Sequence, residues 1–487
     1  MPSNKPTEGV LALDVGTSSV RAVVYDTAGR IVIPTLCDLP YKVRTKEPGE
    51  VSSDPDRLVS LIAQAIDGAL KGAPKKMSII GVGTSCYWHS LMGIDAKGRP
   101  TTELFTWADT RSASETRRLR AAEDEHAYHA RTGCFFHASY WPAKLRWLRS
   151  TRAAAFRKTV RWVSLGEYLY RDFFGDMPAV SVSIASGTGL LDVNRCDWDP
   201  AALRLAGIHS QQLATLDDWD HSRHGLHPAL ARRWPQLARI PWYLPLGDGG
   251  LANVGASAVD PAWACATIGT SSALRIIMAA ERLDIPWGTF VYRLDRRRFV
   301  VGGALSEGGN VVRWLTEGMG IKDKTKLERA AAGVPPDSHG LTILPFWAGE
   351  RSPNWRADAR AVIAGLSLGT LPAHLLRAVM EAITYQLASV AGSVERVAAR
   401  PKALIATGGQ LVHSPAWCQI LADALNLPVM TSPEQEASSR GAALGGIRLQ
   451  NEGSSNPSRQ TLIPLGPYSY ISGSLRRSVS VLSIHSS

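Results

Sequence analysis

One short pattern occurs twice in this sequence, about half a chain length apart. At residues 10 to 26 an apolar run ends at Asp14, turns through Gly16-Thr17-Ser18-Ser19 and continues into a second apolar run. Residues 264 to 276 repeat the order of strand, Gly-Thr-Ser-Ser and strand. Each copy predicts a β-hairpin with a hydroxyl-rich turn. One copy alone is as consistent with an ordinary turn, but the repeat predicts two similar domains whose turns face one another and hold a polyphosphate.

The residues of these turns suit a phosphate ligand. Gly16 can adopt a backbone geometry that other residues resist, and it lets a ligand approach closely. Asp14 carries the charge that a hydrated Mg²⁺ prefers. Asp248 lies in a third glycine turn, Gly247-Asp248-Gly249-Gly250, where a carboxylate can meet substrate and metal without crowding. Each of these residues is also compatible with a simple turn.

Composition narrows the class of protein. The 487 residues are 45% hydrophobic and 20% charged, which is typical of a globular chain of several domains. No apolar run is long enough to span a membrane, and the polar first residues lack the apolar core of a signal peptide. Six scattered cysteines without a CxxC motif favour reduced thiols. We therefore expect a cytoplasmic protein without a membrane partner.

The chain is basic, with a net charge of +11. Its basic residues cluster at 111–120, 144–161 and 293–298 but form no dense block of the kind that binds nucleic acid, so we expect mostly solvated helix faces and no nucleic-acid partner. The positive charge would instead attract small anions.

Between the two hairpins the pattern is α/β. Arg30 to Ile33 is a candidate strand, a helix is expected from Pro55, residues 77 to 84 read as a buried strand, and residues 140 to 174 read as helical. The stretch from Trp107 to Arg111 joins an aromatic ring, a carboxylate and a cation, which suits a hydroxyl-rich ligand but also a loop held by a salt bridge.

After the second hairpin we expect a long helix from about Pro372, a strand at 403 to 409 that ends in Gly408-Gly409, and close packing of the small-residue helices after Asp248 and Ser438. The residues after about 450 are turn-rich, and we expect a loosely held tail.

Taken together, these motifs resemble the FGGY family of carbohydrate kinases over residues 10 to about 450. LDVGTSSVR and TIGTSSALR look like its two phosphate hairpins, GDGG like its catalytic-aspartate turn, and residues 361 to 381 like its C-terminal signature. HSLMGID, TWADTR and PFWAGERSPNWRADAR look most like the gluconate-kinase branch, with xylulokinase next. The proline of SYWPAKLRW is one position nearer Lys144 than in the family's N-terminal signature.

The resemblance implies an actin-like ATPase fold of two RNase H-like domains with a central cleft. We expect a sugar-binding domain at 1–250, an ATP-binding domain at 251–450 and a tail at 451–487. It implies Asp248 as the catalytic base and Mg²⁺ near Asp14 and Asp248. The implied ATP- and phosphate-binding residues are Gly16, Thr17, Ser18, Arg21, Gly269, Thr270, Ser271, Gly408, Gly409 and His413, the last standing where the glycerol-kinase branch has an adenine-binding asparagine. The sugar-binding candidates are His89, Ser90, Trp107, Asp109, Arg111, Tyr140 and Asp248.

Three functions stay open at this point. The first is an ATP-dependent kinase of a sugar or sugar acid, with D-gluconate as the expected substrate and Arg111 as the candidate partner of its carboxylate. The second is an actin- or chaperone-like ATPase without a sugar, and the third is a sugar sensor without catalysis. Asp14 and Asp248 speak against the third. The oligomeric state is not determined by the sequence, with a homodimer as the candidate.

Overall fold

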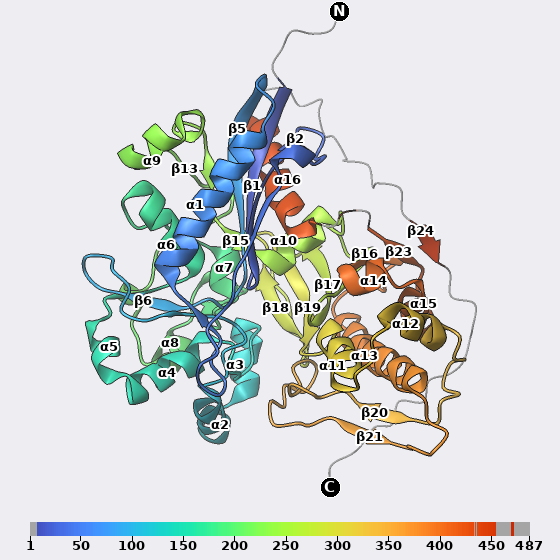
Figure 1. Cartoon of the computed structure of the whole chain (residues 1–487). Coiled ribbons are helices and arrows are strands. Elements are labelled where there is room, and N and C mark those ends of the chain that lie inside the picture. The colour runs from blue at the N-terminus through green and yellow to red at the C-terminus, as the bar shows by residue number, and fades with distance from the viewer. Residues whose placement is uncertain (1–6, 433, 435, 454–468, 472–487) are drawn as a thin grey trace, which may run out of the picture. The chain divides into compact units, whose positions relative to one another are not determined.

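The computed structural model (Figure 1) describes residues 7–432, 434, 436–453 and 469–471. The chain forms two compact units that are not consecutive in sequence. Unit 1 comprises Met1–Val259, Ile277–Val301 and Glu436–Pro464, and unit 2 comprises Asp260–Ile276, Gly302–Gln435 and Leu465–Ser487. These units differ from the boundaries expected at 250 and 450, because two later segments of the chain return to unit 1. Most of the expected tail from 451 lies outside the described residues.

Unit 1 is built on a mixed sheet with the strand order β13-β14-β5-β1-β2-β3, to which β15 adds beside β5. These strands are β1 (Thr7–Val15), β2 (Ser19–Asp26), β3 (Cys37–Pro40), β5 (Met77–Cys86), β13 (Ser222–Arg223), β14 (Trp242–Tyr243) and β15 (Leu246–Gly247). Four two-stranded sheets accompany it: β4 (Ser52–Ser53) with β7 (Leu104–Phe105), β6 (Met92–Ile94) with β8 (Arg161–Val163), β9 (Val180–Ser181) with β12 (Leu216–Asp217), and β10 (Leu191–Asp192) with β11 (Asp197–Trp198).

The helices of unit 1 include α1 (Pro55–Gly72), α2 (Ala113–Ala122), α3 (Glu125–Thr132), α4 (Trp141–Thr151), α5 (Ala153–Lys158), α6 (Leu165–Phe174), α7 (Val182–Ser186), α8 (Pro200–Ala206), α9 (Pro228–Arg233), α10 (Asp248–Gly255) and α16 (Ala437–Gly453). The helix expected from Pro55 is confirmed as α1, where the Asp54 side chain accepts from the amides of Asp56 and Arg57. This cap satisfies backbone donors that the first turn leaves unpaired.

A second sheet has the strand order β18-β19-β17-β16-β22-β23-β24. Its strands are β16 (Trp263–Ile268), β17 (Ser272–Ala279), β18 (Phe290–Arg293), β19 (Arg298–Leu305), β22 (Ala403–Thr407), β23 (Val429–Thr431) and β24 (Ser469–Ile471). β18 and the adjoining parts of β17 and β19 belong to unit 1, and the rest to unit 2. Unit 2 also holds the pair β20 (Thr342–Leu344) and β21 (Val362–Ala364), and the helices α11 (Gly309–Gly318), α12 (Lys324–Ala332), α13 (Pro372–Val394), α14 (Gly409–Val412) and α15 (Pro415–Leu425).

Both predicted hairpins are present. β1 and β2 pair antiparallel with Val15 opposite Val20, and β16 and β17 pair antiparallel with Ile268 opposite Ser272. The apolar runs that predicted them are the buried strands themselves. Val10 and Leu11 are both fully buried, because alternate side chains of β1 enter layers on opposite faces of the sheet.

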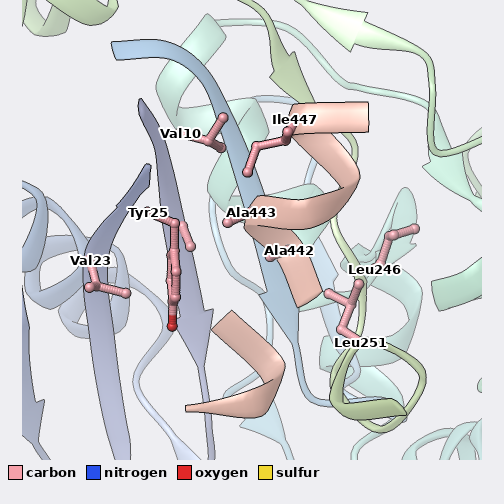
Figure 2. Packing of buried hydrophobic residues seen from close by; sticks show 9 residues of the cluster. Val10, Val23, Tyr25, Leu246, Leu251, Ala442, Ala443 and Ile447 are labelled. Carbon is pink, nitrogen blue, oxygen red and sulfur yellow. The ribbon is translucent and has the colours of Figure 1, made fainter. Parts of the chain in front are cut away.

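A hydrophobic core in unit 1 joins the first hairpin to the last described helix. Figure 2 shows Val10 and Tyr25 of the hairpin beside Ala443 and Ile447 of α16, with Leu251 of α10 below. Burying each larger apolar side chain of such a cluster contributes roughly 1.5–3 kcal/mol before entropy is counted. The core therefore fixes α16 against the sheet that carries Asp14.

The small residues of α10 and α16 allow their backbones to approach closely, as expected from sequence. A Cβ added at Gly255 would lie 1.8 Å from the Ala437 carbonyl oxygen, and one at Gly441 would lie 2.1 Å from that of Leu251. Neither site has room for a side chain, so the glycines determine how closely the two helices pack.

Three sequence expectations need correction. The third strand is β3 rather than Arg30–Ile33, since Ile31 makes only an isolated bridge to Tyr25. Residues 140 to 174 are not all helical, because β8 separates α5 from α6. The basic cluster at 293–298 lies at the end of β18, in the turn and at the start of β19, not on a helix.

No helix in the described part of the chain has the length and hydropathy to cross a membrane.

Candidate active site

Three parallel strands of unit 1 end together with two carboxylates at their ends. β1 and β15 both run parallel to β5, and Val15 and Gly247 pair with the same residue, Cys86. Asp14 is at the end of β1 and Asp248 follows β15 directly, on opposite sides of β5. Ligands of open α/β sheets bind at the carboxyl ends of parallel strands. This edge is therefore the candidate site of unit 1.

The turn of the first hairpin is open. The Gly16 amide donates to the Ser19 carbonyl over 3.0 Å, and the Tyr41 hydroxyl donates to the Gly16 carbonyl over 2.7 Å. Gly16 does not have a positive φ, so this turn does not use the left-handed geometry that glycine permits. An added Cβ would meet only the Ser19 carbonyl oxygen, at 3.4 Å. Together with the exposed Ser18, the turn leaves room for a phosphate.

Asp14 is a buried carboxylate with an arginine beside it. Burial raises its pKa, while Ser85 and Arg21 oppose that rise. The Arg21 Nη1 lies 3.4 Å from Asp14 Oδ2, and Arg21 Nε lies within 3.3 Å of both Asp38 and Glu436 carboxylates. Arg21 thus balances several negative charges, and its contact with a phosphate stays a prediction.

Asp248 is the first residue of α10 and is half-buried. The Gly249 amide donates to Asp248 Oδ1 over 2.8 Å, and Ser438 Oγ donates to its backbone carbonyl over 3.3 Å. A half-buried carboxylate at a strand end can accept a proton from a substrate hydroxyl.

Trp88 holds the strand end that precedes Asp248. A Cβ added at Gly247 would lie 1.9 Å from Trp88 Cε2, so the indole lies directly on this glycine. The Trp88 Nε1–H donates to the Ser183 carbonyl over 2.9 Å, and the Gly247 amide donates to Ser183 Oγ over 3.1 Å. Ser183 therefore holds both the Trp88 ring and the Gly247 backbone in place.

His89 lies in a buried aromatic cluster with a strained backbone. Its φ is 69°, a region that non-glycine residues rarely occupy, and its Nδ1 lies 2.5 Å from the Gly187 carbonyl oxygen. Its ring centroid is 5.0 Å from that of Tyr140 and 5.6 Å from that of Tyr292. The Tyr140 and Tyr292 hydroxyls are 2.7 Å apart.

Sequence reasoning missed Tyr292 and Trp88. Tyr292 lies on β18, about two hundred positions after His89, and no local pattern marks it as a neighbour. Trp88 adjoins His89 in sequence. Gly247, which lies against the Trp88 ring in space, was the one sequence signal, because glycine has no side chain and leaves room for the indole.

Lys144 supports the segment before Tyr140. Its buried amino group donates to the carbonyl oxygens of Ala138 and Ser139. Burial lowers its pKa to about 7. The side chain thus positions the residues that lead into α4.

Ser90 and Trp107, two other sugar-binding candidates, make structural contacts. Ser90 Oγ accepts from the Leu165 amide over 3.1 Å at the start of α6. The Trp107 carbonyl accepts from Ser139 Oγ over 2.7 Å, and its side chain is half-buried. Sugar binding by either residue remains a prediction.

Asp109 and Arg111 form a buried ion pair. Arg111 Nη2 lies 2.7 Å from Asp109 Oδ2 and 3.2 Å from Glu103 Oε1, and its guanidinium lies over the rings of Phe105 and Trp147. Only 6% of its side chain is exposed. These contacts favour the alternative in which the pair holds the loop.

In unit 2, the second hairpin turn meets the N-terminus of α11. The Gly309 amide donates to the Gly269 carbonyl over 2.7 Å and the Asn310 amide to that of Thr270 over 3.1 Å. Ser272 Oγ donates to the Glu307 carbonyl over 2.6 Å. The start of α11 was not among the residues predicted for the site.

The glycine pair after β22 lies beside the same turn. Gly408 has a φ of 84°, and an added Cβ would lie 2.6 Å from the Ile268 carbonyl oxygen, so glycine is needed there. Nothing lies within 4 Å of a Cβ at Gly409 or Gly269. His413 is exposed. These open positions suit a nucleotide, while the individual contacts stay predictions.

The two hairpins are not equivalent at their charged residues. Arg21 lies opposite Asp14 of β1 and Arg275 lies opposite Cys265 of β16, so each arginine shares a sheet face with the aligned residue, Asp14 in the first hairpin and Thr267 in the second. Arg275 Nη2 donates to Thr267 Oγ1 over 2.8 Å. Thr267 stands where the first hairpin has Asp14, so the carboxylate occurs in unit 1 only.

The donor set fits Mg²⁺ bound mainly through phosphate. Among the described residues, no group of three or more His, Cys, Asp and Glu side chains could hold a metal ion by itself. Mg²⁺ usually takes one or two carboxylates and completes its shell with substrate phosphates and water. Asp14 and Asp248 provide two such carboxylates.

Known proteins match nearly the whole chain. The N-terminal domain of the FGGY family of carbohydrate kinases matches residues 9–255, and the C-terminal domain of that family matches residues 264–448. A gluconokinase of Bacillus subtilis (strain 168) is 28% identical over 91% of this chain and 87% of its own. A glycerol kinase of Rhodospirillum centenum (strain ATCC 51521 / SW) is 29% identical over 89% and 88%. The crystal structure of a gluconate kinase from Lactobacillus acidophilus has a TM-score of 0.87 and 24% identity, over 96% of this chain and 94% of that one. The fold is thus that of the actin-like sugar kinases, as expected.

Proposed function

Because the chain belongs to the FGGY family of carbohydrate kinases, we propose that it transfers the γ-phosphoryl group of ATP to the terminal hydroxyl of D-gluconate, giving 6-phosphogluconate. The observation that carries the phosphoryl transfer is the common end of β1, β5 and β15, with Asp14 and Asp248 beside it. The choice of gluconate rests on the sequence motifs and on the similarity to a gluconokinase.

In the proposed reaction Asp248 accepts the proton of the substrate hydroxyl as its oxygen bonds to the γ-phosphorus. The bond between that phosphorus and the β–γ bridging oxygen breaks, and ADP leaves. The backbone amides of the turns at Gly16 and Gly269 donate to phosphate oxygens as charge moves between them. Mg²⁺ bound by Asp14 and Asp248 would neutralise charge on the triphosphate.

The substrate is recognised, in this proposal, by the aromatic cluster of His89, Tyr140 and Tyr292. Their hydroxyl and imidazole groups lie in a buried setting, where hydrogen bonds to a polyol discriminate well against ligands that lack a partner group. We do not assign the gluconate carboxylate to Arg111, because neighbouring carboxylates already surround that guanidinium.

A neutral polyol is the second candidate. The glycerol kinase relative is as similar in sequence as the gluconokinase, so relatedness does not separate the two substrates. Xylulose, a ketose, is a further alternative, because the sequence motifs resemble the xylulokinase branch next after the gluconate-kinase branch.

The test is a panel in which ADP release is measured with D-gluconate, glycerol, D-xylulose and other polyols. We expect the highest kcat/KM with gluconate and slow ATP hydrolysis without an acceptor. A neutral substrate with clearly higher kcat/KM would overturn the choice of gluconate. Brisk hydrolysis that no acceptor accelerates would instead support the chaperone-like ATPase.

The catalytic base is tested with Asp248→Asn, which keeps the size of the side chain but cannot take the proton. We expect a loss in kcat of about 10²- to 10⁴-fold. Asp220→Asn, which removes an exposed carboxylate elsewhere in unit 1, is the matched control and should retain full activity. Activity of Asp248→Asn within a few-fold of wild type would rule out this role.

A further inference from the structure

Two basic clusters that are far apart in sequence line one cavity of unit 1. Arg161 on β8, Arg195 in the turn between β10 and β11, and Arg296 in the turn between β18 and β19 all contribute to it. The cavity has a volume of about 770 Å³, within the range of small-molecule sites. None of its lining residues belongs to the strand-end site around Asp14 and Asp248.

The arginines of this cavity have few partners of opposite charge. Arg161 Nη1 donates to the Leu213 carbonyl over 3.2 Å, which uses one of its five donors. Arg195 is 80% exposed, and its nearest carboxylate, on Asp192, is 3.9 Å away. Within the described part of the chain, the exposed Arg296 side chain forms no ion pair within 4.0 Å.

The charge of the cavity wall is therefore positive. Asp197 is the acidic residue among the described residues that line it, against three arginines. Buried ion pairs account for Arg111 in the same unit, but nothing comparable accounts for these three guanidinium groups. Arginine forks match phosphate oxygens in geometry and charge, and such bonds are stronger than neutral ones.

The rest of the wall suits a hydroxylated ligand. Ser210, Gln211 and Thr215 bring polar side chains, and Trp198 brings a large apolar surface. The Trp198 Nε1–H donates to the Ala214 carbonyl over 3.1 Å, which fixes the indole in the wall. A few polar groups around an apolar surface are typical of sites for small organic ligands.

We propose that this cavity binds a phosphorylated sugar, with the phosphate on Arg161, Arg195 and Arg296 and the sugar against Trp198. Such a site is separate from the proposed phosphoryl-transfer site and does not depend on which substrate the kinase uses.

Calorimetric titration of the full chain with glucose 6-phosphate, inorganic phosphate and glucose tests the proposal. We expect saturable binding of glucose 6-phosphate, weaker binding of inorganic phosphate and no binding of glucose. Arg195→Ala and Arg296→Ala should each raise the Kd for glucose 6-phosphate about tenfold or more, because a hydrogen bond to a charged group is lost. Both side chains are exposed, so the variants should keep the wild-type Tm.

Arg232→Ala is the matched control, since it removes an exposed arginine of unit 1 outside the cavity and should leave the Kd unchanged. An equal loss in this control would show general attraction of anions and overturn the proposal. So would the absence of saturable binding, equal affinity for inorganic phosphate, insensitivity to the two cavity variants, or displacement of the ligand by D-gluconate.

Discussion

Replacing Gly247 by alanine should disturb the proposed site through a steric contact. The new Cβ would lie 1.9 Å from Trp88 Cε2 and 2.1 Å from its Nε1, so these atoms must separate by about 1.5 Å to reach ordinary contact near 3.4 Å. The indole cannot easily yield, because it is 6% exposed, donates to the Ser183 carbonyl and packs against the Tyr292 ring at 4.7 Å.

The strain must therefore be shared between Trp88 and the backbone that carries Asp248. Overpacking of this kind typically costs about 1–3 kcal/mol. A displacement of about 1 Å at a catalytic group can reduce the rate by about 10²-fold. We expect Gly247→Ala to lower Tm by several degrees and kcat/KM by about 10²-fold in a coupled assay of ADP release.

Gly250→Ala, in the helix α10 that follows Gly247, is the matched control. Its Cβ would meet flexible ends first, Leu294 Cδ1 at 3.1 Å and Val300 Cγ2 at 3.4 Å, so activity should stay within a few-fold of wild type. Wild-type Tm and kcat/KM for Gly247→Ala would refute the reasoning, because the contact with Trp88 would then not constrain Asp248.

Two further changes test other parts of the structure. Arg111→Lys removes the fork that binds Asp109 and Glu103, so kcat/KM should fall by a similar factor for gluconate and for neutral substrates; a loss confined to gluconate would instead show that Arg111 binds the carboxylate. Burial raises the pKa of Glu307 to about 7. Between about pH 4.5 and pH 7 the folded state therefore binds one proton that the unfolded state has lost. The contribution of Glu307 to the free energy of unfolding falls as pH rises through that window. Glu307→Gln should remove the dependence, so its Tm relative to wild type should rise from pH 5 to pH 8; a constant difference would contradict the shift.

The sequence predicted those parts of the site that a local pattern encodes. The turns at Gly16 and Gly269 and the glycines around Asp248 are short motifs whose geometry depends on neighbours in sequence, and the structure has both hairpins as expected. Only the family resemblance placed Asp14 near Asp248, because the strand before Asp248 has just two residues, Leu246 and Gly247, and was not predicted.

The contacts between segments that are far apart in the chain could not be predicted from the sequence. Tyr292 reaches Tyr140 because β18 folds into unit 1, and no spacing rule predicts that. Likewise, Arg111 could equally bind an anion or hold a loop until the positions of Glu103 and Asp109 were known. The expected domain limits stay a prediction, and the small residues of α16 indicated a close neighbour without saying that this neighbour is α10.

The return of α16 to unit 1 has a consequence for biosynthesis. The ribosome synthesises residues 260–435 before it synthesises α16. Until then, the side chains of the first hairpin and of α10 that pack against α16 stay exposed. Contacts between such distant segments form slowly, and apolar surface that waits for them favours aggregation. An expressed fragment that stops at Val259 would carry both Asp14 and Asp248 yet lack the helix that closes their core. The position of α16 in the sequence therefore makes the maturation of unit 1 depend on translation through residue 453.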